Sequence, residues 1–185
     1  MIFVKRNNRL LFLFAICLCL NTATIAQNLV SKNAKVRFFS STPIEDIKAV
    51  SEKGVVVIIP KTGEIAFQVA IATFDFDKGL MEEHFNENYM ESPKFPFARF
   101  NGKISPFPDL TKDGEYTVTA TGNLLIHGVL KQRTIPGKIT VSNGKAKLIS
   151  AFDVACAEHS IKIPKLVFTK VAEVIKVNIE TTLIP

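Results

Sequence analysis

The chain has 185 residues, of which 47% are hydrophobic, and its formal net charge is +6. Three of the basic residues, Lys5, Arg6 and Arg9, precede an apolar run at 10–20 that carries no charge, and without them the net charge is only +3. Such a small and dispersed charge excludes the basic surface that binds nucleic acid. The length and the apolar content favour one globular domain with a substantial core.

The first 26 residues have the three parts of a secretory signal peptide. The basic start is followed by LLFLFAICLCL at 10–20 and by the small residues of NTATIAQ, with a suitable cleavage point after Ala26. Eleven apolar residues are fewer than the about 20 that a membrane-spanning helix needs, and the cysteines in the run lack the preceding small residue of a lipoprotein signal. We therefore expect a cleaved signal peptide at 1–26, a single domain at 27–185, and a periplasmic or secreted protein that is soluble after cleavage.

The remaining sequence is dominated by the period-two alternation of strands that bury one face. In KTGEIAFQVAI (61–71), large apolar side chains occupy every second position from Ile65 to Ile71. Comparable patterns predict strands at 34–40, 54–59, 65–71, 97–104, 115–127, 134–141, 147–155 and 173–183. Glycine-containing turn sequences at 60–63, 112–115 and 142–145 separate several of them, and the last two have the residues of β-hairpin turns.

One segment, 77–92, has helical rather than alternating periodicity. Leu80, Met81, His84 and Phe85 recur at helical spacing, and the segment ends before Pro93. We expect one short helix near residues 78–91. Many short strands with a single helix predict an all-β fold, either a barrel or a sandwich.

The inward faces of the predicted strands combine large and small apolar residues. The chain contains 15 Phe, two Tyr and no Trp, so its interior has aromatic volume with few polar groups. A packed core would explain each Phe by itself, but small residues facing large ones in a barrel of about eight strands can leave room for a ligand. The predicted channel residues are Phe38, Phe67, Val69, Ile71, Phe100, Ala120, Gly122, Leu124, Ile126, Phe152 and Val177.

The polar residues form no recognisable catalytic constellation. No Ser/His/Asp motif, phosphate-binding loop or paired-carboxylate spacing is present, and we expect neither an enzyme nor a cofactor. Cys156 and His159 are three residues apart but lack further metal ligands, so no metal site is expected. His84, Arg99 and His127 are the candidates for contacts with a ligand head group at the rim.

Five segments resemble the YceI-like family, the polyisoprenoid-binding proteins of bacterial periplasms. They are VRFFSSTPIEDIKA (36–49), TGEIAFQVAIATFDFDKGLM (62–81), LMEEHFNENYMESPKFPFARFNGKI (80–104), GNLLIHGVLKQRTIPGKITV (122–141) and AEVIKVNIE (172–180). The MEEHFNENYMES block is most similar to the branch found in Bacteroidetes. The resemblance implies a lipocalin-like, extended antiparallel β-barrel of about eight strands, with a helix near one end and a long isoprenoid chain inside.

Together these observations predict an exported binding protein. It would hold a long-chain apolar lipid, an isoprenoid of the polyprenyl or quinone type, for transport, storage or shielding. Transient membrane contact and a homodimer are compatible with this function. The alternative is a structural or stress-response interaction protein, without bound lipid, that works through the barrel exterior.

Overall fold

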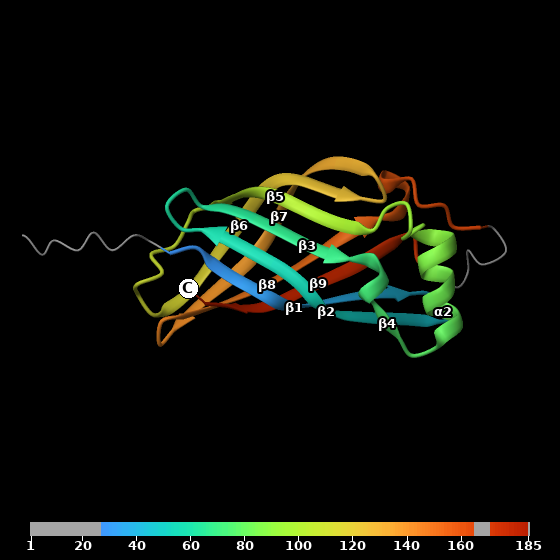
Figure 1. Cartoon of the computed structure of the whole chain (residues 1–185), viewed down its shortest axis with the longest axis horizontal. Coiled ribbons are helices and arrows are strands. Elements are labelled where there is room, and N and C mark those ends of the chain that lie inside the picture. Colours follow the sequence, from blue (N-terminus) through green and yellow to red (C-terminus); the bar gives the residue numbers. More distant parts are fainter. Residues whose placement is uncertain (1–26, 165–170, 185) are drawn as a thin grey trace, which may run out of the picture.

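The computed structural model describes residues 27–164 and 171–184, and the predicted signal peptide lies outside these residues. The described chain forms one antiparallel sheet (Figure 1). Its strands are β1 (Leu29–Ser41), β2 (Asp46–Ile59), β3 (Glu64–Ala70), β4 (Asp75–Phe76), β5 (Phe97–Ser105), β6 (Gly114–Ile126), β7 (Val129–Ser142), β8 (Lys145–Ala155) and β9 (Val174–Leu183).

The sheet closes on itself. Its strand order is β1-β9-β8-β7-β6-β5-β3-β2-β4, and β1 also pairs with β2 from Leu29↔Ile58 to Ser41↔Asp46. This pairing closes all strands except β4 into an eight-stranded antiparallel barrel, as the family resemblance implied, whereas the strand pattern alone had left a barrel or a sandwich open. The two-residue β4 pairs with β2 at Ala49 and Val50, on the edge of β2 that β3 occupies at 55–59.

The strand alternation located every strand of the ring, but three of them begin at least five residues earlier than predicted. β1 begins at Leu29 rather than at residue 34, β2 at Asp46 rather than at residue 54, and β7 at Val129 rather than at residue 134. The added part of β7, VLKQR at 129–133, is mostly polar, so hydrophobic alternation could not reveal it. The very short β4 was not predicted.

Two tight turns join long strands. Asn143 and Gly144, with φ of 51° and 72°, connect β7 to β8, which confirms the hairpin predicted at 142–145. His127 and Gly128, with φ of 49° and 73°, connect β6 to β7 in the same way. Consecutive positive φ values are those of the type I′ turn. The hairpin predicted at 112–115 is wrong, because β5 ends at Ser105 and a long loop precedes β6.

The predicted helix is present at one end of the barrel (Figure 1). It comprises α2 (Gly79–His84) and a π-helical continuation, η2 (Phe85–Tyr89). Two short 3-10 turns, η1 (Ile71–Thr73) and η3 (Cys156–His159), follow β3 and β8. Within the described ranges, no helix has the length and apolar character needed to span a bilayer.

The two ends of the barrel are packed differently. The end away from α2 contains fully buried aliphatic side chains, among them Ile58, Ile139 and Leu183. Nearer α2 the buried cluster consists of Val36, Ala49, Val69, Phe74 and Ile179, with half-buried Phe side chains around it. The first end is therefore a solid core.

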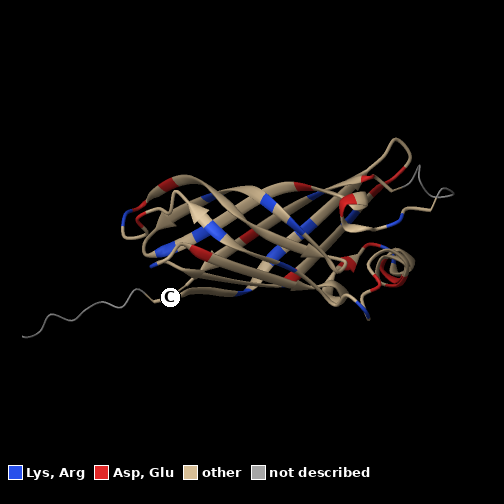
Figure 2. Cartoon of the chain, turned by 90° about the horizontal axis from the view of Figure 1, so that it is seen from above, with Lys and Arg blue, Asp and Glu red and all other residues tan. Residues whose placement is uncertain are grey.

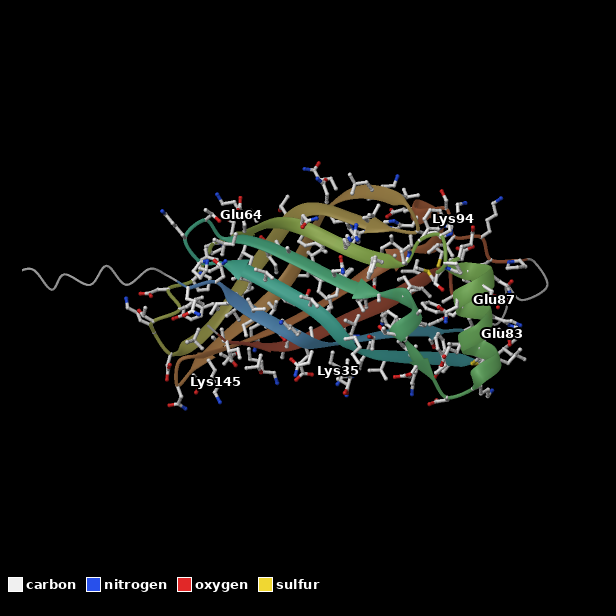
Figure 3. The ribbon with its side chains drawn as sticks, in the orientation of Figure 1. Lys35, Glu64, Glu83, Glu87, Lys94 and Lys145 are labelled. Carbon is white, nitrogen blue, oxygen red and sulfur yellow. The ribbon has the colours of Figure 1, made fainter. Side chains whose placement is uncertain are left out.

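The barrel exterior carries charges of both signs (Figure 2). Lys35 Nζ lies 2.7 Å from Glu52 Oε1, and Glu180 contacts both Arg37 and Lys147, at 3.4 Å and 2.7 Å. The labelled lysine and glutamate side chains in Figure 3 point away from the barrel. Mixed exposed charges contribute about 0–1 kcal/mol per pair, so the apolar interior is the main source of stability.

Candidate functional site

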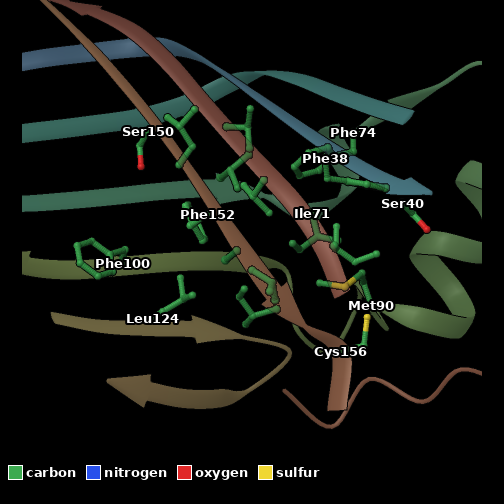
Figure 4. Close-up of a pocket in the computed structure, with 18 of the residues that line it drawn as sticks. Phe38, Ser40, Ile71, Phe74, Met90, Phe100, Leu124, Ser150, Phe152 and Cys156 are labelled. Carbon is green, nitrogen blue, oxygen red and sulfur yellow. The ribbon is translucent and has the colours of Figure 1, made fainter. Parts of the chain in front are cut away.

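A cavity of about 510 Å³ lies inside the barrel (Figure 4). This volume is within the range of about 300–1,000 Å³ that is usual for small-molecule sites. Phe67, Phe100, Leu124 and Phe152 line it from β3, β5, β6 and β8. The interior is therefore a core at one end and a hollow towards α2.

The period of two along each strand positions the lining. Every second side chain of a strand points to the same face, and β1 contributes Val36, Phe38 and Ser40 in this way. Ser150 of β8 also lines the cavity, and the hydroxyls of both serines already have hydrogen-bond partners. Ser40 Oγ accepts a hydrogen bond from Ala172 N at 2.9 Å, and Ser150 Oγ donates one to the Pro136 carbonyl at 2.7 Å. The lining consequently offers few free polar groups to a guest.

Ten of the eleven predicted channel residues line this cavity. They are Phe38, Phe67, Val69, Ile71, Phe100, Ala120, Leu124, Ile126, Phe152 and Val177. Their inward position agrees with the alternation, and their role in binding remains a proposal.

Gly122 is the exception, because it does not line the cavity and its predicted place in the channel is wrong. It lies opposite Gly102 on β5, and a Cβ added to Gly122 would collide with the Asn101 carbonyl and the Gly102 Cα. A Cβ on Gly102 would in turn lie 2.6 Å from the Thr121 carbonyl oxygen. These glycines therefore allow two backbones to approach closely, and they do not create space for a guest.

Four Phe rings join the helical end to the barrel. Phe85 stacks on Phe38, with ring centroids 5.3 Å apart, and also contacts Phe74 and Phe76 at 5.7 Å and 5.1 Å. All four line the cavity. The sequence interpretation missed Phe74 and Phe76, although the alternation in TFDFD places both on one face. It also missed Met90 and Cys156, which come from irregular segments.

The cavity reaches solvent beside α2. Lys78, Leu80 and His84 line it and are exposed, so His84 lies where the rim prediction put it. Lys78 Nζ lies 3.2 Å from Glu45 Oε1 and thereby links the start of α2 to the loop between β1 and β2. We refer to the opening at Glu45, Lys78, Leu80 and His84 as the axial mouth.

Arg99 does not lie at the mouth, so its predicted position at the rim is wrong. Its side chain is on the outer face of β5, where Nε donates to Gln68 Oε1 at 2.8 Å and the guanidinium lies 5.0 Å from the centre of the Phe97 ring. Odd-numbered residues of β5 point outward, whereas Ala98 and Phe100 line the cavity. Arg99 is therefore separated from the cavity by the barrel wall.

His127 is also not a mouth residue. It is 9% exposed, and its Nδ1 and Nε2 lie 3.1 Å from the His159 carbonyl oxygen and 3.2 Å from Glu91 Oε1. The Phe95 ring packs edge-on against it at 4.5 Å. These contacts connect the β6–β7 turn to η3 and to the segment after the helix, which is a structural role.

Cys156 and His159 belong to the 3-10 turn η3. Burial raises the pKa of the Cys156 thiol, so at neutral pH the thiol is protonated and poorly nucleophilic. Burial lowers the pKa of His159, whose Nδ1 lies 3.2 Å from the Val129 carbonyl oxygen. In the part of the chain that the structure describes, no three His, Cys, Asp or Glu residues converge as metal ligands.

Comparison with known proteins identifies related sequences and folds. The family model described as YceI-like domain matches residues 28–183. No curated protein matches the chain.

Solved structures share the fold at low sequence identity. A polyisoprenoid binding domain from Saccharophagus degradans, implicated in plant cell wall breakdown, has a TM-score of 0.72 and 12% identity over 86% of this chain and 98% of its own. BcnA of Burkholderia cenocepacia has a TM-score of 0.68 and 15% identity, with coverage of 82% and 96%. The YceI protein of Campylobacter jejuni has a TM-score of 0.52 and 15% identity, with coverage of 70% and 78%.

Proposed function

The chain belongs to the YceI-like family, and from this premise we propose that it is a binding protein that holds a long-chain apolar lipid inside the barrel. The lipid is an isoprenoid of the polyprenyl or quinone type. The observation that carries the proposal is the cavity of about 510 Å³, whose ionisable lining residues gather at its helical end. The Saccharophagus degradans neighbour, described as a polyisoprenoid binding domain, supports the ligand class.

The energetics favour recognition of the tail. Each buried CH₂ contributes about 0.8 kcal/mol, so ten buried carbons contribute about 8 kcal/mol before the cost of association. An exposed ion pair with a head group adds only about 0–1 kcal/mol. The tail therefore determines affinity, and polar groups at the mouth determine which head is accepted.

The distribution of polar residues orients the ligand. Glu45, Lys78 and His84 lie at the axial mouth, whereas Ile65 and Ile104 line the opposite end of the cavity. A charged or strongly hydrated head would lose its water at the apolar end without gaining a partner. The tail accordingly extends towards the solid core, and the head remains near α2.

Export and membrane contact complete the proposed function. Lipid tails do not cross water unshielded, so an exported barrel would transport, store or shield them in the periplasm or outside the cell. Ile44 and Leu80, which are 62% and 63% exposed, flank the Lys78–Glu45 pair in sequence. Such exposed apolar side chains beside the mouth are suited to transient contact with a membrane.

Mass spectrometry of an organic extract tests the proposal. Protein purified from its native source without detergent is compared with an unrelated periplasmic protein prepared in the same way. We expect an isoprenoid in the first extract in near-equal molar amount to protein, and none in the second. Repeated absence of any amphiphile would favour the alternative role through the barrel exterior.

A further inference from the structure

The backbone pairing between β7 and β8 is not continuous. β7 pairs with β6 from Val129 to Val141, and β8 pairs with β9 from Ala146 to Ala155. β7 and β8, however, pair with each other only between 137–142 and 145–150. Among the described residues, no backbone hydrogen bond joins 129–136 to 151–155. We call the unpaired region between these two segments the β7–β8 slot.

The slot begins at Pro136. Proline has no backbone N–H, so this residue cannot donate to β8. Pro136 is exposed, and yet it lines the cavity together with Gly137 and Ser150, which are neighbours across the last β7–β8 pair. In Figure 4, Ser150 and Phe152 follow one another along β8 towards the helical end. The cavity therefore reaches the slot.

Side chains rather than a strand ladder bridge the slot. Arg133 Nη2 donates to the Asp153 carbonyl at 2.8 Å, and Nη1 donates to Glu158 Oε2 at 3.0 Å. At the far end, His159 Nδ1 lies 3.2 Å from the Val129 carbonyl oxygen. At a rise of about 3.3 Å per residue, the distance along β7 from Val129 to Pro136 is about 23 Å. Among the described residues, this long unpaired stretch is thus bridged near its middle by the Arg133 side chain.

We propose that the β7–β8 slot is a lateral portal through which the apolar tail of the ligand enters and leaves the cavity, with Arg133 as its latch. This inference rests on the proposed binding function. At the axial mouth, α2 and the stacked rings of Phe85 and Phe38 lie beside the entrance, so a long tail would have to pass them carbon by carbon. A slot parallel to the strands admits many carbons of an extended chain in one opening event.

Cross-linking the slot tests the portal. Thr134 and Asp153 are exposed and become opposite neighbours when the register of Gly137 and Ser150 is continued. A Thr134→Cys, Asp153→Cys protein in a Cys156→Ala background is linked with a short bis-maleimide. The Asp153 carbonyl is retained, so the Arg133 contact can still form. The probe is all-trans-retinol, whose fluorescence reports entry into a dry cavity in stopped-flow mixing.

We expect the cross-link to slow both retinol uptake and release by at least about tenfold without changing the amount bound at equilibrium. A Thr121→Cys, Thr134→Cys protein, linked in the same way, is the matched control, because these hydroxyls are 3.0 Å apart across the continuous β6–β7 pairing. Its rates should remain near those of the unlinked protein. Arg133→Ala should accelerate both rates by a similar factor and leave Kd unchanged.

The outcomes separate the portal from the binding function. If the slot-linked protein binds retinol as fast as its unlinked form, the ligand enters elsewhere and the portal is wrong. The same conclusion follows if the Arg133→Ala protein melts normally and its rates do not change. If the unlinked protein takes up no retinol and contains no lipid, the binding function fails, and the portal fails with it.

Discussion

Filling the cavity from within is the sharpest perturbation that the structure offers, and Ala120→Phe does this. Ala120 lies on β6 between Ile104 of β5 and Ile135 of β7, and all three line the cavity. The new ring can extend into existing space, and we expect the variant to fold because no packed side chain must move aside.

The expected loss of binding free energy follows from the volumes of the ring and of the cavity. A cavity of about 150 Å³ holds one benzene molecule, so the added ring would occupy roughly a third of the 510 Å³. If the ring displaces about six tail carbons, the loss is about 5 kcal/mol. That free energy corresponds to a Kd that is higher by about three powers of ten.

The assay combines lipid content with stability. The lipid that co-purifies with the Ala120→Phe protein is quantified by mass spectrometry, retinol is titrated into the delipidated protein, and thermal unfolding is followed by circular dichroism. Thr117→Phe, at an exposed position on the same strand, is the matched control and should retain its lipid. An Ala120→Phe protein that melts like wild type and carries the same amount of lipid would falsify the interior site.

The remaining predictions address the helix, a buried histidine, a glycine and the amino terminus. Phe85→Ala should loosen α2, costing up to about 3–5 kcal/mol for loss of a packed aromatic ring; hydrogen exchange at 79–89 should accelerate, and unchanged protection would contradict this. Because burial lowers the pKa of His159 below its ordinary value of about 6.5, the unfolded chain takes up the proton first as the pH falls. The contribution of His159 to the free energy of unfolding should therefore be full above about pH 6.5 and decrease below it. In urea titrations at several pH values, the free energy of unfolding of His159→Gln should fall less steeply with decreasing pH than that of the wild type; an equally steep fall would assign the pH dependence to other groups. Gly122→Ala should destabilise the barrel by about 1–3 kcal/mol through collision with the neighbouring backbone, whereas Gly79→Ala, where a Cβ meets nothing within 4 Å, is the matched control; equal melting temperatures would refute this account. Amino-terminal sequencing of the exported protein should begin at or near Gln27, and retention of residues 1–26 in a cytoplasmic pool would refute the signal peptide.

Sequence periodicity was sufficient to predict which side chains share a face of each strand. Alternation in a strand fixes which side chains share a face, so Phe67, Phe100 and Phe152 could be placed on the inner face before the structure was known. It does not report how sharply two strands bend towards each other. Gly122 shares a face with Ala120 and Leu124, but its surroundings are set by the close approach of the β5 backbone.

Residues near strand ends were the least predictable. The position of His127 depends on the turn that it enters with positive φ and on the fold-back of η3 onto that turn. The β7–β8 slot was equally hidden, because alternation does not indicate whether a strand has a bonded neighbour on each side. Assignment to a Bacteroidetes branch, the signal peptide and a homodimer stay predictions.

The most direct test of a lipid held inside the barrel is a crystal structure of the protein purified from its native source without detergent. The account predicts continuous tube-like electron density along the cavity, in contact with Phe67, Phe100 and Phe152, with its wider end near Lys78. A well-ordered barrel whose cavity contains no such density, in protein whose extract is also free of amphiphiles, would contradict the account.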